Sequence, residues 1–175
     1  AFGASLWAAG RYDEELELHE QIGPAELARL QPMTRVYHSV VLGLLKLHMG
    51  EIEVASALID TTMRDLAAVP AHERQDISGV DPRVLALTQA ISIRVHQGRL
   101  ADADALTDDA LRVAHERQHE PTSAWAFAMA RWRAYRHGDW EEAIRQSRAS
   151  LEIAERLGFT PRVSAGKMLL GRALI

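Results

Sequence analysis

Apolar residues recur at helical spacing along most of this chain, and glycines interrupt them at nearly regular intervals. Each of these glycines ends an apolar stretch and is followed two residues later by an aromatic or aliphatic residue. They are Gly10, Gly50, Gly98 and Gly138, separated by 40, 48 and 40 residues. Because glycine readily adopts the left-handed conformation that ends a helix, the pattern predicts a string of helix pairs joined by short turns.

Prolines mark the other ends of the same units, at Pro82, Pro121 and Pro161. Proline is favoured in the first turn of a helix, where its missing amide hydrogen would have no partner anyway. The predicted antiparallel pairs are 1–9 with 12–22, 33–49 with 52–68, 82–97 with 100–118, and 121–137 with 140–157, followed by a single helix at 161–175. Strand signals are absent, a short helical piece is expected over 25–30, and the polar stretch 70–79 is expected to be an exposed loop.

Small residues also recur with the repeat. Ala55, Ala103 and Ala143 each stand five residues after a turn glycine, whereas the first repeat has Glu15 at this position. Alanine lets two helix axes come close together, so we expect these positions to lie where the two helices of a pair meet.

The segment 138–143, Gly-Asp-Trp-Glu-Glu-Ala, resembles the tetratricopeptide (TPR) repeat in its turn glycine, its aromatic residue and its alanine. Gly3 and Gly43 match a second glycine that this family favours seven residues before the turn, whereas Ile91 and Arg131 depart from it. The resemblance implies an all-α fold, a right-handed α-α superhelix of TPR-like helix pairs. It also implies one domain over 1–175, with pairs at about 1–31, 33–68, 82–118 and 121–157 and a terminal helix at 161–175.

More narrowly, four segments are similar to the repeat region of large bacterial signalling regulators. These segments are Gly79–Val84, Ala114–Pro121, Leu157–Phe159 and Leu170–Ala173. Such regulators join TPR-like repeats to a nucleotide-hydrolysing ATPase module and to either an adenylate/guanylate cyclase domain or a LuxR-type DNA-binding domain. The resemblance implies that the chain is a fragment of such a regulator, as its missing initial methionine also suggests. No GxxxxGK[ST] phosphate-binding loop occurs, so this part is not expected to hydrolyse a nucleotide.

Composition narrows the expected partners. The 175 residues are 47% hydrophobic and 25% charged, which is typical of one globular domain. A formal net charge of -4 argues against direct binding of nucleic acid. Cysteine is absent, which excludes disulfides and thiolate chemistry and favours a cytoplasmic location. No apolar run approaches the roughly 18 residues of a membrane helix, so no membrane contact is expected.

The repeat pattern places one stripe of each first helix on a concave wall. The candidate binding residues on this wall are Tyr37, Leu44, Leu85, His96, Trp125, Trp132, Tyr135, Arg136, Met168 and Arg172. Trp, Tyr and Arg often dominate binding energy because they remove a large area from water while keeping a polar tip. The stripe predicts a protein or peptide partner, another domain of the parent chain, or a second copy in a homo-oligomer. The alternative is that Trp125 and Trp132 are core residues.

His115-Glu116-Arg117-Gln118-His119 matches HExxH, the pattern with which zinc proteases bind their metal and activate water. Here it falls at the end of a predicted helix, has polar residues at its centre and lacks a nearby third ligand. We therefore expect a structural helix end, with no metal, no cofactor and no catalytic activity. A zinc metalloprotease remains the remote alternative.

Two clusters of charged residues are interpreted as parts of helix ends and not as binding sites. Arg131–His137 mixes cations with aromatic residues, as a single-strand binder would, but cations are favoured in the last turn of a helix. Asp102, Asp104, Asp108 and Asp109 open the helix at 100–118 and are interpreted as complementing its dipole. The sequence thus predicts a non-catalytic interaction module. A small-molecule or peptide sensor is the alternative, with Tyr135, Arg136 and His96 as its polar groups.

Overall fold

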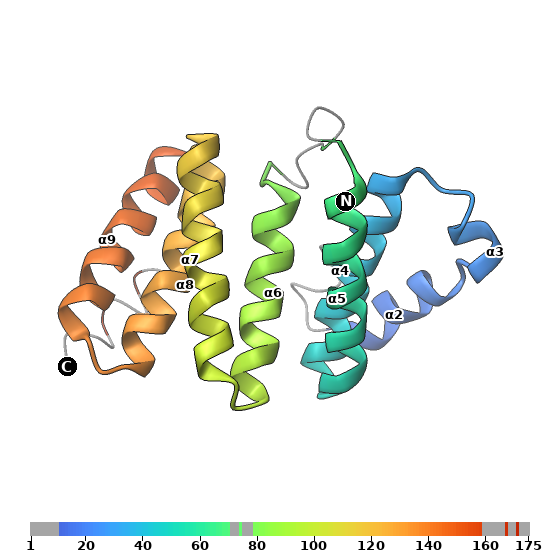
Figure 1. The fold of residues 1–175 in the computed structure, drawn as a ribbon, viewed down its shortest axis with the longest axis horizontal. Helices are drawn as coiled ribbons and strands as arrows, with labels where there is room; N and C mark the ends of the chain where they lie inside the picture. The colour runs from blue at the N-terminus through green and yellow to red at the C-terminus, as the bar shows by residue number, and fades with distance from the viewer. Residues whose placement is uncertain (1–10, 71–73, 75–78, 159–166, 168–170, 172–175) are drawn as a thin grey trace. The chain divides into compact units, whose positions relative to one another are not determined.

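In the computed structural model the described residues are 11–70, 74, 79–158, 167 and 171 (Figure 1). These residues form helices and connecting segments, with no strand among them. The chain divides into two compact units, residues 1–75 and 76–175, which are treated separately below.

The first unit contains four described helices: α2 (Tyr12–Glu20), α3 (Pro24–Leu27), α4 (Pro32–His48) and α5 (Ile52–Ala68). α4 packs against α5 as a helix pair, and α2 packs against α4. The core of this pair consists of aliphatic side chains that solvent hardly reaches, with Val36 and Leu45 on α4 and Ile59 and Leu66 on α5.

The second unit contains α6 (Pro82–His96), α7 (Leu100–Arg117), α8 (Glu120–Arg136) and α9 (Trp140–Arg156). Each helix packs against the next one in the chain, and α6 also contacts α8 (Figure 1). The α8 helix is therefore covered by three neighbours. Its buried positions are almost all alanine, which allows the close approach: Ala124, Ala126, Ala128, Ala130 and Ala134.

The predicted helices agree closely with the structure. Each long helix in the described part of the chain begins and ends within two residues of its predicted bounds, while the short piece expected at 25–30 is α3, at Pro24–Leu27. The predicted helix 1–9, most of the predicted loop 70–79 and most of the predicted helix 161–175 lie outside the described residues.

The turn glycines end their helices in the way the sequence predicts. Gly98 has φ +72° and Gly138 has φ +71°, the left-handed region where a side chain is disfavoured. The amide after each glycine donates back to a carbonyl five residues earlier, as in Arg99 N–H to Arg94 O at 2.8 Å. This is the bonding of a Schellman motif, and it satisfies helix carbonyls that would otherwise lack a donor.

The alanines five residues after the turns are fully buried. Ala55, Ala103 and Ala143 each have no solvent exposure. Their burial is consistent with the prediction that small residues stand where paired helices meet. Glu15, which occupies the same position in the first repeat, is also buried, at 3% exposure.

Among the described residues, no helix combines the length and the apolarity needed to cross a lipid bilayer.

Candidate binding surface

In the first unit, the candidate wall residues lie on α4. Tyr37 is 41% exposed, and Leu44 is half-buried. Their spacing of seven residues, about two helical turns, places them on the same face of the helix. Val40, between them, is 5% exposed, so the exposed ring of Tyr37 borders the core of the pair.

In the second unit, the candidate wall residues lie on α6 and α8. Leu85, Trp125, Trp132, Tyr135 and Arg136 are half-buried, whereas His96 is exposed. The two tryptophans are seven residues apart on α8 and are neither fully buried core nor fully exposed. Met168 and Arg172, predicted for the same wall, lie outside the described residues.

Arg136 is the best-defined polar group on this stripe. Its guanidinium carbon lies 5.9 Å from the centre of the Trp132 ring, within the range of a cation–π interaction. Nη2 donates to Asp104 Oδ1 on α7 at 3.2 Å. Nε and Nη1 are buried and have no hydrogen-bond partner. The Trp132 and Arg136 side chains thus present an aromatic face together with N–H groups that still lack an acceptor.

Tyr135 contacts a residue that the sequence analysis did not include in the wall. Its ring meets the ring of Trp140 edge to face, with the two centroids 5.0 Å apart. Trp140 is 48% exposed at the start of α9. Its position in the repeat could have indicated this exposure. Trp140 stands two residues after the turn glycine Gly138, and Leu100, which stands two residues after Gly98, is also exposed.

Part of the cationic run at the end of α8 pairs with aspartates of α7, contacts that the sequence did not predict. Arg133 forms an ion pair with Asp108, and Arg136 forms one with Asp104. His137 Nε2 lies 2.7 Å from Asp104 Oδ2. Asp104 and Asp108 therefore bind the neighbouring helix, whereas Asp102 and Asp109 pair with Arg99 and Arg112.

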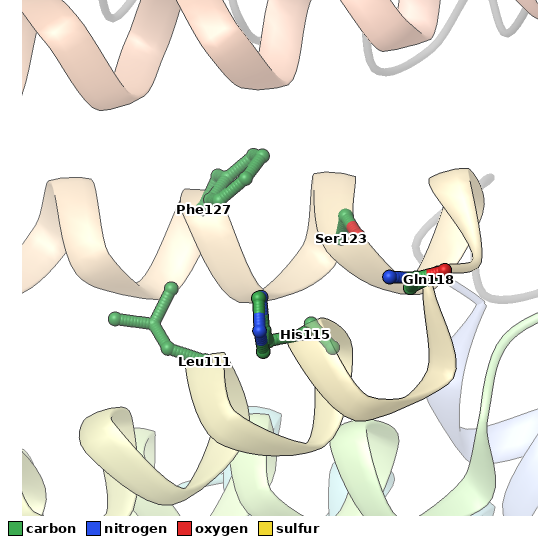
Figure 2. A pocket seen from close by; sticks show the side chains of 6 residues that line it. Leu111, His115, Gln118, Ser123 and Phe127 are labelled. Carbon is green, nitrogen blue, oxygen red and sulfur yellow. The ribbon is translucent and has the colours of Figure 1, made fainter.

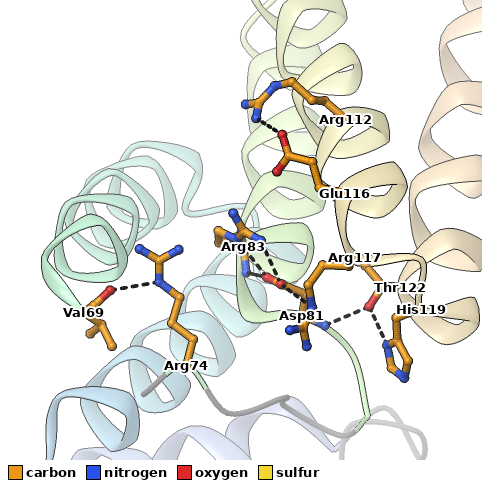
Figure 3. A network of polar contacts seen from close by, with 9 residues as sticks. All are labelled: Val69, Arg74, Asp81, Arg83, Arg112, Glu116, Arg117, His119 and Thr122. Carbon is orange, nitrogen blue, oxygen red and sulfur yellow. Dashed lines mark hydrogen bonds and ion pairs between the residues drawn. The ribbon is translucent and has the colours of Figure 1, made fainter. Parts of the chain in front are cut away.

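A second polar cluster joins the start of α6 to the α7–α8 turn (Figure 3). Asp81 is 3% exposed and accepts from the backbone N–H of Arg83 at 2.8 Å, which caps α6. Its carboxylate also pairs with Arg83 Nη2 at 3.1 Å and Arg117 Nε at 3.3 Å. The Asp81 N–H donates to Thr122 Oγ1 at 3.1 Å, and this oxygen lies 3.0 Å from His119 Nδ1.

The same clamp recurs one repeat later in a more exposed form. Glu120 pairs with Arg156 at 2.6 Å, thirty-six residues along the chain, the same separation as between Asp81 and Arg117. In both cases the acid directly precedes a proline, and the arginine stands at the end of the second helix of the pair. The ion pairs were not predicted from the sequence, although the acid–proline steps recur in it with the spacing of the repeat.

The HExxH segment does not form one continuous helix. α7 ends at Arg117, and Gln118 is left-handed with φ +47°, so His119 precedes α8 instead of extending α7. Glu116 accepts from Arg112 Nη1 at 3.0 Å. Among the described residues, no group of three potential protein ligands is arranged to hold a metal ion.

A surface cavity of about 200 Å³ lies between α7 and α8 (Figure 2). It is lined by Leu111, Ala114, His115, Gln118, Ser123 and Phe127. Typical sites for drug-sized ligands measure roughly 300–1,000 Å³, so this cavity is small. None of the polar groups predicted for a sensor site, which are Tyr135, Arg136 and His96, lines it.

The α2–α4 contact in the first unit contains buried titratable groups. The rings of His19 and His38 lie 4.9 Å apart, and His38 Nε2 lies 3.2 Å from the His19 backbone oxygen. Burial, and then the neighbouring His38, lower the pKa of His19. Burial raises the pKa of Glu15. Both shifts favour the uncharged side chain, as expected for groups removed from water.

No protein-family model matches this chain, and neither does any curated protein.

Proposed function

We propose that this chain is a non-catalytic protein–protein interaction module, which binds a protein or peptide segment through the stripe carried by α6 and α8. The observation that carries the proposal is the half-buried set Trp125, Trp132 and Arg136 on α8. It combines aromatic area with guanidinium N–H groups that lack acceptors. Residues of these types, partly withdrawn from water, supply the largest share of energy in many interfaces.

The repeat organisation supports the same proposal. Two helix pairs of nearly equal length, with the same glycine turn, the same buried alanine and the same acid–arginine clamp, pack side by side in the second unit. We interpret these pairs as TPR-like repeats of a right-handed superhelix. Stacked helix pairs of this kind create extended surfaces suited to holding another chain.

The wider biological setting follows from the sequence resemblance. We place the chain in a cytoplasmic bacterial signalling or transcriptional regulator of the LuxR-type or cyclase-linked ATPase class. In such a protein the module would hold the other domains of the parent chain, or a second copy, in a regulated assembly.

Peptide selection against the isolated chain tests the binding role. Peptides chosen from a random displayed library would be measured against the chain by isothermal titration calorimetry. We expect Trp132→Ala and Trp125→Ala each to weaken binding at least about tenfold, which corresponds to 1.4 kcal/mol. Truncation removes an aromatic anchor whose area the partner covers.

Leu100→Ala provides the matched control, since Leu100 is an exposed apolar residue of the same unit on α7. This variant should bind the selected peptides as the unaltered chain does. Peptides whose affinity is indifferent to both tryptophan substitutions, or equally sensitive to Leu100→Ala, would show that the α6–α8 stripe is not the binding surface. Circular dichroism of each variant would confirm that the helices are intact.

A further inference from the structure

Arg131 on α8 is a half-buried arginine with no partner in the described part of the chain. Its Nε is buried and makes no hydrogen bond. The other half-buried arginines of α8 differ from it, because Arg133 and Arg136 pair with Asp108 and Asp104 of α7. The missing counter-ion is therefore particular to Arg131 and is not a general property of this helix.

The repeat shows that this position normally holds a buried uncharged residue. Arg131 stands seven residues before the turn glycine Gly138, and the equivalent residues are Gly43 on α4 and Ile91 on α6. Gly43 is buried, and Ile91 has no solvent exposure. Among the three described repeats, a guanidinium thus stands at this core position only on α8.

Such a placement is costly without an anion. Burial lowers the pKa of Arg131, which means that its charged form is poorly solvated where it lies. Withdrawing an ion from water without pairing it is destabilising, and a buried N–H without an acceptor adds to the destabilisation. A charged residue that destabilises the free protein in this way is a candidate for a contact with a ligand.

We propose that Arg131 is an oxyanion-binding residue, which receives a carboxylate or phosphate group from a bound ligand. Planar guanidinium groups suit such ligands because they donate two parallel hydrogen bonds to them. Phe127, one turn earlier on the same face of α8, lines the cavity between α7 and α8, so this face of the helix also carries an apolar side chain.

This site is separate from the binding stripe. Five residues separate Arg131 from Arg136, which corresponds to about 140° around an α-helix. The proposal therefore does not depend on the function of Trp125 and Trp132, and the two can fail independently.

Thermal unfolding of the chain in sodium acetate or sodium phosphate tests the site. Ionic strength would be held at about 0.15 M with sodium chloride, so that screening does not change. We expect a saturable rise in Tm with at least one of the two anions. A response to acetate alone identifies a carboxylate ligand, and a response to phosphate alone identifies a phosphorylated one. A response to both identifies a general oxyanion site.

Arg131→Met removes the charge while keeping an unbranched side chain, and it should abolish the saturable response. Arg148→Met is the matched control, because Arg148 is an exposed arginine on α9, and it should keep the response. Any general stabilisation by phosphate through exclusion from the protein surface would remain in both variants.

The Nε–H resonance of Arg131 in NMR spectra gives a second measurement on the unaltered chain. We expect it to shift along the same saturation curve as the Tm. Equal anion responses in Arg131→Met and the unaltered chain, or a resonance that does not move with either anion, would overturn the proposal. If Arg131→Met fails to fold, Arg131→Lys takes its place, since it keeps the charge but loses the paired donors and should respond more weakly.

Discussion

Replacing Asp81 separates the two tasks of its carboxylate, capping α6 and pairing with Arg83 and Arg117. Asp81→Ala removes both. Loss of the cap to the Arg83 amide should cost about 1 kcal/mol. The two ion pairs add up to about 1 kcal/mol each, because their arginines are 28% and 40% exposed and partly screened by water. We expect the free energy of unfolding to fall by about 2–3 kcal/mol.

Asp81→Asn keeps an oxygen that can accept from the Arg83 amide but removes the charge. It should therefore be more stable than Asp81→Ala by about 1 kcal/mol, the value of the cap alone. Glu120→Ala is the control for an exposed clamp, since Glu120 and Arg156 are 48% and 50% exposed. It should cost no more than about 1 kcal/mol.

Urea unfolding followed by tryptophan fluorescence measures these differences. Three of the four tryptophans, Trp125, Trp132 and Trp140, belong to the second unit, so the signal mainly reports the unit that contains Asp81. With a typical slope of about 2 kcal/mol per molar urea, Asp81→Ala should lower the midpoint by roughly 1 M. Equal midpoints for Asp81→Ala and Asp81→Asn, or for Asp81→Ala and Glu120→Ala, would refute this division of the energy.

Three further predictions concern packing, backbone conformation and pH. Ala143→Leu should lower the free energy of unfolding by about 1–3 kcal/mol, because Ala143 has no solvent exposure and a larger side chain would overpack its surroundings. An unchanged midpoint in the same urea assay would contradict close packing at this position. Gly138→Ala should cost about 1–2 kcal/mol through its φ of +71° alone, since an added Cβ would meet no atom within 4 Å. Gly23→Ala, equally open but without a positive φ, should cost less, and equal losses would argue against backbone strain. The pKa of His19 in the folded chain lies below its ordinary value of about 6.5. As pH falls below that value, the unfolded chain takes up a proton at His19 before the folded chain does, so the stability present above it is progressively lost. The protection factors of the α2 amides, which correct for the slower intrinsic exchange in acid, should therefore fall on acidification, and His19→Gln should remove this dependence if the interpretation is correct.

The sequence predicted the helices well because their signals are local. Gly50, Gly98 and Gly138 favour the left-handed conformation through their own missing side chains, and Pro82 fixes its own φ at the start of α6. The burial of Ala55, Ala103 and Ala143 followed from the repeat, since equivalent positions in stacked pairs have equivalent surroundings.

The charged residues were harder to interpret from the sequence. The Arg131–His137 run and the aspartates at the start of α7 were assigned to their own helix ends, whereas Arg133 pairs with Asp108 and Arg136 pairs with Asp104 between α8 and α7. These partners are 25 and 32 residues apart, and nothing in the local pattern indicates which carboxylate a long arginine side chain will reach.

By itself, the sequence determined where the described helices begin and end and which small residues are buried, because backbone conformation and repeat spacing are properties of neighbouring residues. Only the tertiary structure decided which charges are paired and that Asp81 is a buried clamp. It also showed that Arg131 and Glu15 place ionisable groups at positions where the equivalent residues of other described repeats are buried and uncharged. The physical reason is that the solvation of a side chain depends on all the elements packed around it, and those elements are distant in the sequence.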